Sequence, residues 1–332
     1  MGTMKKLAFL TGIAGLALGT VLAATATGSA DDAKLEQLKE QGFARLAIAN
    51  EPPYTAVAAD GKVSGAAPDV AREVFKRLGV PDVAASISEY GAMIPGLQAG
   101  RFDVITAGLF MKPERCAAVA YSEPVLCDAE AMLVKKGNPK NFKSYEDVAR
   151  DSSATIGAPG GGTEEKLALN AGVPRERVIV VPDGQSGLKM VQDGRIDAYS
   201  LPVLSISDLM KKANDPNLEV IAPVQGAPVY CDGAAFNKKD TALRDAFDVE
   251  LAKMKKSGEF AKIIEPTASR PLPRSRRPAR NSARHSKSDL HPAASRPNAG
   301  AGYLLSLSGG EVARARRRAG EGHSQIERDR AQ

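Results

Sequence analysis

The chain is 332 residues long, carries a formal net charge of +6, and contains 3 cysteines, 3 histidines and no tryptophan. Its length allows one large domain or two small ones. The spacing of Cys116, Cys127 and Cys231 fits no zinc or redox motif, so those site classes are excluded and we expect neither a metal nor a cofactor.

The first 30 residues have the pattern of a secretory signal peptide. Lys5 and Lys6 precede an uncharged apolar stretch at 7–24, and small residues ending at Ala26 or Ala30 offer cleavage sites. The stretch is only weakly hydrophobic for a membrane span. We therefore expect a cleaved signal and an exported, periplasmic protein.

Residues 31–125 alternate helical and β-rich patterns. The expected helices are 31–41, 68–78 and 90–99, and the expected strands are 44–48 and 104–107. Such alternation predicts an α/β fold with mostly parallel sheets.

The end of the strand at 104–107 carries the first candidate site. Gly108 provides a turn, and Phe110 and Arg115 follow it closely. Ligand sites in α/β proteins form where strands end, and a guanidinium can hold a carboxylate through two parallel hydrogen bonds. The alternatives are a surface turn with a solvated arginine, or an arginine in a salt bridge.

A second α/β cycle follows residues 137–139. Its expected helices are 145–150, 164–171, 187–193 and 204–212, its strands are 154–156, 178–181, 198–200, 218–224 and 229–236, and a helix at 241–257 completes the pattern. The glycines at 160–162 and Thr163 open one helix, where glycines permit close approach and free N–H groups favour an anion. Thr163 also suits the N-cap position. The run lacks the spacing of a nucleotide-binding loop.

Cys127 and Cys231 occur in similar settings, Leu-Cys-Asp-Ala and Tyr-Cys-Asp-Gly. If their segments are neighbours, an oxidising compartment would allow a disulfide between them, with Cys116 as a spare thiol.

Residues 267–332 hold 13 arginines and one lysine against five acids, as well as every histidine. The basic charge therefore belongs to this tail. Its Arg-, Ser-, Pro-, Ala- and Gly-rich composition cannot bury a core and predicts disorder. A nucleic-acid-binding arm is one interpretation. We favour a shifted reading frame near the end of the gene, and expect no nucleic-acid partner.

The middle of the chain resembles the type II periplasmic solute-binding proteins of ABC importers, in particular the polar amino-acid receptors. The resemblance rests on six motifs in family order, at 52–55, 96–104, 113–115, 122–124, 160–163 and 193–198. It implies two lobes, the first from 41–125 plus 231–266 and the second from 132–226. The crossings between them would lie at 126–130 and 227–230.

One departure from the amino-acid receptors concerns the ligand's positive charge. Those receptors usually place an acid soon after the strand that follows Asp197, to pair with an α-ammonium, whereas here no acid occurs until Asp208. A buried ammonium without a partner is costly, so we expect a more diffuse cation. Tyr54, Tyr90 and Phe110 could meet it with their faces.

These residues resemble those of ectoine/hydroxyectoine-binding receptors. The resemblance implies that the ligand is a small zwitterion, and that a permease and its ATPase receive it from a monomeric receptor. The ligand-binding roles that it implies fall on Glu51 for the ring nitrogens, Tyr54, Tyr90 and Phe110 for an aromatic box, Arg115, Gly162 and Thr163 for the carboxylate, and Glu165 for a further polar contact.

Two other functions stay open. One is a receptor for a polar amino acid or a betaine. The other is an exported dehydratase on the same fold, which would need a general acid or base. Residues 31–266 contain no histidine, and Glu51 is the only obvious candidate. We therefore expect no enzyme activity and assign no catalytic residue.

Overall fold

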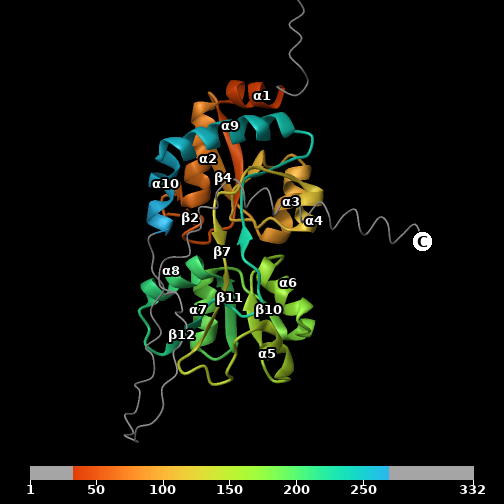
Figure 1. The fold of residues 1–332 in the computed structure, drawn as a ribbon, viewed down its shortest axis with the longest axis vertical. Helices are drawn as coiled ribbons and strands as arrows, with labels where there is room; N and C mark the ends of the chain where they lie inside the picture. Colours follow the sequence, from red (N-terminus) through yellow and green to blue (C-terminus); the bar gives the residue numbers. More distant parts are fainter. Residues whose placement is uncertain (1–32, 269–332) are drawn as a thin grey trace, which may run out of the picture.

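The computed structural model describes residues 33–268, with side chains to residue 265. Figure 1 shows two lobes, one above the other, joined by extended segments. The predicted signal peptide lies outside the described residues, as does the predicted basic tail from residue 269 on. No helix among residues 33–268 is long and apolar enough to cross a membrane.

The upper lobe of Figure 1 is built on a five-stranded sheet. Its strands, in spatial order, are β4 (Asp82–Ile87), β1 (Phe43–Ile48), β5 (Val104–Ile105), β14 (Ala235–Phe236) and β6 (Ala120–Tyr121). A small hairpin adds β2 (Ala56–Val57) and β3 (Val63–Ser64). The helices are α1 (Ala33–Gln41), α2 (Ala66–Arg77), α3 (Tyr90–Gln98), α4 (Pro113–Ala118), α9 (Thr241–Ser257) and α10 (Glu259–Ala268).

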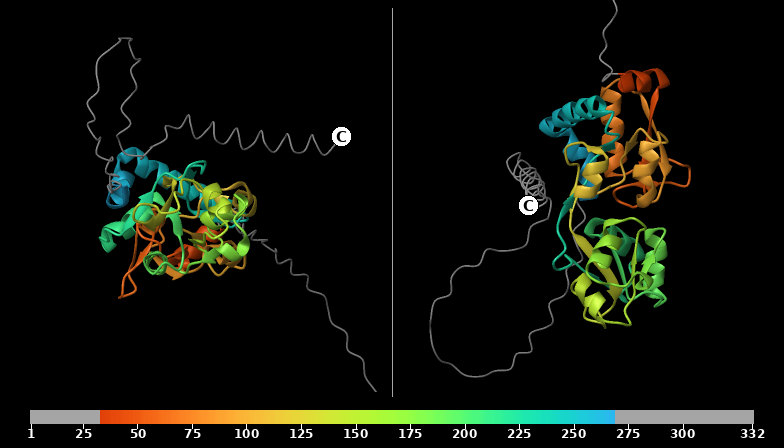
Figure 2. Two further views of the ribbon diagram at one scale, coloured as in Figure 1. Left: turned by 90° about the horizontal axis from the view of Figure 1, so that it is seen from below. Right: turned by 90° about the vertical axis from the view of Figure 1, so that its right-hand side faces the viewer.

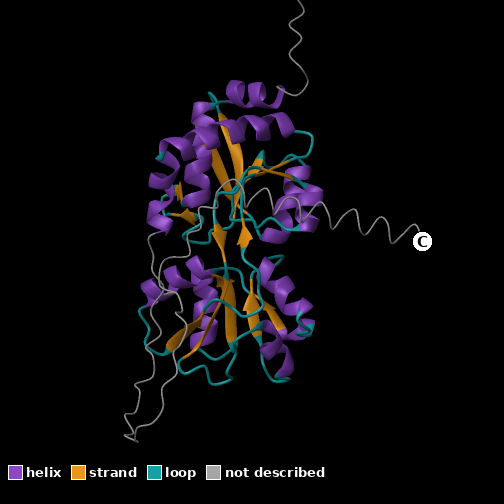
Figure 3. Ribbon diagram, viewed as in Figure 1, coloured by secondary structure: helices purple, strands orange, loops and turns teal. Residues whose placement is uncertain are grey.

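The lower lobe repeats this plan. Its strands, in spatial order, are β10 (Val178–Val180), β9 (Ile156–Ala158), β11 (Ala198–Pro202), β8 (Glu130–Lys135) and β12 (Leu218–Ile221). Its helices are α5 (Tyr145–Arg150), α6 (Thr163–Asn170), α7 (Gly184–Gln192) and α8 (Val203–Ala213), with a 3₁₀ turn at Arg175–Arg177. Helices flank the strands in both lobes (Figure 3), which confirms the expected two-lobed α/β fold.

Each sheet is mixed, whereas the sequence pattern predicted mostly parallel pairing. In the upper lobe β1 runs parallel to β4 and β5, but β14 runs antiparallel to β5 and β6. In the lower lobe β9 runs parallel to β10 and β11, but β8 runs antiparallel to β11 and β12. The antiparallel strands β8 and β14 are those that enter a lobe from the other one, so they approach the sheet from the opposite end.

Two short strands connect the lobes. β7 (Cys127–Asp128) pairs antiparallel with β13 (Tyr230–Cys231), and Cys127 and Cys231 form a disulfide. Among the described residues Cys116 is left as a free thiol. The side view in Figure 2 places both connections along one side of the molecule.

Apolar side chains fill both faces of each sheet, as expected for sheets covered by helices. On β1, Leu46 and Ile48 belong to one core cluster and Ala47 to another, because successive side chains point to opposite faces. These packed sheets hold the strand ends, and the loops that follow them, in fixed positions.

The expected element pattern was incomplete, since it lacked short elements such as α4 and β6, and it was wrong at 229–236. Residues 229–236 form two short strands instead of one, because β13 pairs with β7 at the connection between the lobes whereas β14 joins the sheet of the upper lobe. The sequence pattern also gave no strand at β4. That edge strand is largely exposed and contains small residues, so its apolar signal is weak.

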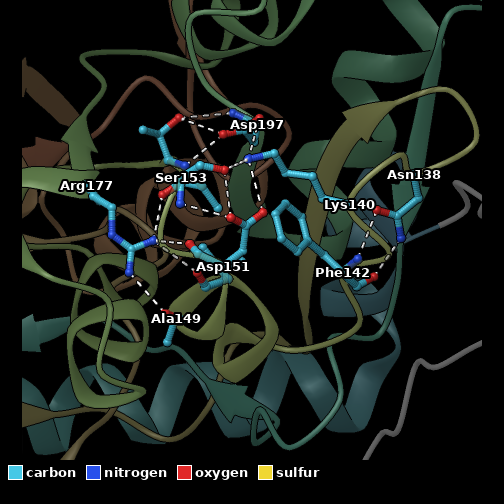
Figure 4. Close-up of polar contacts among 11 residues, drawn as sticks. Asn138, Lys140, Phe142, Ala149, Asp151, Ser153, Arg177 and Asp197 are labelled. Atoms are coloured by element: carbon cyan, nitrogen blue, oxygen red, sulfur yellow. Dashed lines mark hydrogen bonds and ion pairs between the residues drawn. The ribbon is translucent and has the colours of Figure 1, made fainter.

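A polar network stabilises the lower lobe around the end of α5. Arg177 donates to the carbonyl groups of Val148, Ala149, Asp151 and Ala154 at 2.6–3.2 Å (Figure 4). The bonds to Val148 and Ala149 satisfy carbonyl groups at the helix end that have no partner within the helix.

Candidate functional site

The loop after β1 brings the first acid between the lobes. Asn50 adopts a left-handed backbone with φ of 51°, and its side chain accepts a hydrogen bond from Val57 N at 3.0 Å. Thr55 Oγ1 accepts a bond from Glu51 N, also at 3.0 Å. These contacts close the loop on itself and direct Glu51 inward.

Glu51 is buried and bonded to both lobes. Its carboxylate accepts hydrogen bonds from Tyr90 Oη at 3.1 Å and, across the lobes, from Ser205 Oγ at 2.7 Å. Burial, reinforced by the nearby Glu164 carboxylate, raises the pKa of Glu51 to about 7. The sequence analysis did not identify Ser205, since nothing around it distinguishes it from an ordinary residue in the first turn of a helix.

The three predicted aromatic residues lie close together but have different surroundings. Tyr90 and Phe110 line a pocket between the lobes. Phe110 stacks on Tyr230 with ring centroids 5.8 Å apart, and meets Tyr54 edge-on at 6.4 Å. Tyr54 is 1% exposed, belongs to the core of the upper lobe, and packs against Gly108. Tyr54 therefore packs edge-on against Phe110 and does not line the pocket itself.

Tyr54 also takes part in a contact at the connection between the lobes. Its hydroxyl donates to Asp128 Oδ2 at 2.9 Å, and the same oxygen accepts from Leu204 N of the lower lobe. Burial raises the pKa of Asp128 to about 6. Asp128 thus joins the two lobes beside the disulfide.

Arg115 reaches the pocket from the first turn of α4. It is 6% exposed, and donates to Phe110 O and to Gly161 O of the opposite lobe, both at 3.0 Å. These bonds use two of the five N–H groups of the guanidinium. A buried guanidinium in this position is suited to a carboxylate ligand.

The glycine run lets the lower lobe approach the upper one closely. Gly161 has φ of 71°, and a Cβ placed on it would lie 2.5 Å from the Cα of Gly91. Gly91 N donates to Gly160 O at 3.3 Å. Gly162 is the N-cap of α6, and both Gly162 and Thr163 line the pocket.

Of the two acids after Thr163, the structure turns Glu164 toward the pocket. Glu164 is 4% exposed and lines it. Glu165, which the sequence analysis named, accepts hydrogen bonds from Gly161 N and Arg175 Nη1 instead, each at 2.5 Å. Glu165 therefore stabilises the glycine loop, and the direct polar wall of the pocket is Glu164.

The pocket between the lobes is small and partly open to solvent. Its lining residues come from both lobes and are Tyr90, Gly108, Phe110, Arg115, Gly162, Thr163, Glu164 and Pro202. The pocket is thus lined by a guanidinium, the start of a helix, one acid and two aromatic rings. This arrangement suits a small zwitterion.

The absence of an acid soon after the strand that follows Asp197 does not leave the lower lobe without an acid at the pocket. The strand after Asp197 supplies none, but Glu164 reaches the same space from α6. Aromatic lining, more than the lack of an acid, is therefore the feature that favours a diffuse cation here. No cluster of metal-ligating side chains is found within residues 33–268.

Comparisons with known proteins agree on one family. The family model of the bacterial extracellular solute-binding proteins, family 3, matches residues 45–266. The probable amino-acid ABC transporter periplasmic-binding protein y4tE of Sinorhizobium fredii is 39% identical over 240 residues, which are 69% of this chain and 78% of the relative.

Two solved structures are informative. The crystal structure of EhuB in complex with hydroxyectoine is similar with a TM-score of 0.70 and 82% identity, covering 71% of this chain and 92% of that one. The ancestral amino acid-binding protein AncCDT-1, a precursor of cyclohexadienyl dehydratase, is similar with a TM-score of 0.62 and 26% identity over 70% of this chain and 98% of that one.

Proposed function

Because the chain belongs to the bacterial extracellular solute-binding proteins of family 3, we propose that it is the ectoine- and hydroxyectoine-binding receptor of an ABC importer. The observation that carries this proposal is the interlobe pocket, which Arg115, Glu164 and Phe110 line together. The 82% identity to EhuB, solved with hydroxyectoine, supports it.

The chemistry of the pocket suits the two ends of such a ligand. Arg115 and the N–H groups at the start of α6, near Thr163, would bind the carboxylate. The cyclic amidinium would lie against Phe110 and Tyr90, with Glu51 and Glu164 as acceptors for its N–H groups. A ligand bound between the lobes favours their closed arrangement, since it contacts both.

The receptor would act outside the inner membrane. The predicted signal peptide would direct the chain to the periplasm, where the closed, loaded form would deliver its solute to a permease driven by an ATPase. Nothing in this role requires bond making or breaking, and we propose that the protein is not an enzyme.

Ligand-dependent thermal unfolding tests the proposal. Ectoine and hydroxyectoine should raise the melting temperature of the purified protein with the logarithm of their concentration, by an amount equivalent to about 2.7 kcal/mol at a hundredfold excess over Kd. Glutamate, arginine, histidine and glycine betaine should raise it far less. Equal shifts for the amino acids or the betaine would reject the ectoine assignment and favour an amino-acid or betaine receptor.

The similarity to a precursor of a dehydratase gives a second candidate function. Glu51, with a pKa of about 7, is the group that could serve as a general acid or base. Chromatography of hydroxyectoine recovered after long incubation with the protein should return it unchanged, and a product that has lost its hydroxyl group as water would favour the enzyme.

A further inference from the structure

Two buried acids, Glu130 and Glu164, face one another beside the pocket. Glu130 is the first residue of β8 and is fully buried, and Glu164 lies in the first turn of α6. Their carboxyl groups are within hydrogen-bonding reach of each other. Neither oxygen of Glu130 accepts a bond from any N–H or O–H group of the described residues. A buried polar group in this position needs a partner.

Two carboxylates can share a hydrogen bond only if one of them carries a proton, and two like charges buried together repel strongly. The pair therefore holds a proton. The surroundings decide which acid carries it.

Glu164 has the surroundings of a carboxylate. Burial raises the pKa of Glu164 too, but the cations Arg115 and Lys112 oppose that rise, and the N-terminus of α6 favours negative charge. Its acidic neighbours are Glu51 and Glu130.

Glu130 has the surroundings of a neutral acid. Its electrostatic neighbours come from five elements or loops. They are Glu164 on α6, Asp128 on β7, Glu51 in the loop after β1, Tyr145 on α5 and Tyr230 on β13. None of these neighbours is a cation. Burial, together with these acids, holds the pKa of Glu130 well above its usual range.

We propose that Glu130 is a positioning residue whose protonated carboxyl donates a hydrogen bond to Glu164, so that Glu164 presents a fixed carboxylate to the ligand pocket. This inference deepens the proposed function. Its consequence for the ligand, that the fixed charge would face the positive ring of ectoine, rests on that function. A hydroxyl or amide donor at position 130 could replace the proton, whereas an apolar side chain could not.

The proton on Glu130 can be tested without any ligand. An acid with a raised pKa in the folded state binds more protons when folded than when unfolded, so its contribution to stability falls as pH rises above about 4.3, the usual pKa of glutamate. Glu130→Gln lacks this penalty. Its melting temperature relative to the native protein should therefore increase steadily from about pH 5 to about pH 8.

Glu36→Gln is the matched control, since Glu36 is an exposed residue of α1. This control should follow the native pH profile. Parallel profiles for Glu130→Gln and the native protein would show that Glu130 is not the proton carrier, and would overturn the inference.

Calorimetry with ectoine at pH 7 tests the positioning role. Glu130→Gln, whose amide can donate to Glu164, should keep the native Kd within about threefold, whereas Glu130→Leu should weaken binding at least about tenfold, as expected for a charged hydrogen bond. Equal weakening by both substitutions would overturn the role. If Glu130→Leu fails to fold, a tenfold or greater loss of affinity in Glu130→Gln alone would overturn the role as well.

The two experiments separate this inference from the proposed function. If ectoine does not bind to the native protein, the proposed function fails while the pH profiles still decide whether Glu130 carries a proton. If ectoine binds but the profiles are parallel, the receptor assignment stands and the inference fails.

Discussion

At the scale of single residues, the pocket depends on a few buried charged groups whose partners come from both lobes. Arg115 bonds to Gly161 O, and Glu51 bonds to Ser205, so each group is already fixed by the opposite lobe. Fixed donors and acceptors cost little further ordering when a ligand arrives. Substituting either group should therefore affect binding more than folding.

Replacing Arg115 should remove the carboxylate partner of the ligand. We expect Arg115→Ala to weaken ectoine binding at least about tenfold, since hydrogen bonds to charged groups contribute about 1.5–3 kcal/mol each. Arg115→Lys should recover little of the lost affinity, because an ammonium lacks the two parallel N–H groups of the planar guanidinium. Isothermal calorimetry measures both. Arg150→Ala, at an exposed residue of α5, is the control, and unchanged affinity in Arg115→Ala would contradict the assignment.

The residue types of the site could be predicted from the sequence better than their orientations. Arg115 was recognisable because it comes soon after the end of a strand. The glycine run was recognisable because it comes just before the start of a helix. Glu164 was missed in favour of Glu165 because neighbouring helical positions differ by roughly 100° around the axis, and only the packing of α6 decides which one faces inward. Glu130 was missed because its partner belongs to a different element.

At the scale of elements, the loop that precedes α6 controls how closely the lobes can meet. Gly161 lies against Gly91 of α3, and no side chain fits between them. The sequence predicted that this run lets the chain approach a ligand closely. It could not identify Gly91 as the opposing residue, because that contact depends on the relative placement of two lobes. Within each lobe, elements with strong periodicity, such as the helix at 241–257, could be predicted, whereas the exposed edge strand β4 could not.

A methyl group at Gly161 should keep the lobes apart. We expect Gly161→Ala to weaken ectoine binding at least about tenfold, because the added Cβ would overlap Gly91 and the left-handed backbone costs an alanine about 1–2 kcal/mol. Gly226→Ala is a matched control, since Gly226 has φ of 78° and no atom within 4 Å of the added Cβ. The control should lose a similar amount of stability but keep its affinity. Equal affinities for both variants, by calorimetry, would argue against the steric explanation.

At the scale of the whole molecule, the chain crosses between the lobes twice, and the disulfide joins the two crossings. The bond between Cys127 and Cys231 closes a loop that contains the whole lower lobe, because 104 residues separate the two cysteines. A cross-link of this length restricts the unfolded chain more than the folded one.

Loss of this disulfide should lower stability without removing the pocket. We expect the Cys127→Ser/Cys231→Ser double variant to lose about 2–4 kcal/mol of unfolding free energy, and a reducing agent to have a similar effect on the native protein. Chemical denaturation measures the change. Cys116→Ser is the control and should leave stability within about 0.5 kcal/mol, as for most surface substitutions. No difference between the double variant and the native protein would contradict the expectation.

The position of the two crossings has a mechanical consequence. Both run along one side of the molecule (Figure 2), and their bonded cysteines prevent them from separating. An opening of the lobes must then bend the two crossings together, about an axis that passes across them on that side of the molecule. Ile87 and Val180 lie on opposite lobes and line the same hollow between them. Spectroscopic labels at these two positions would report that opening directly.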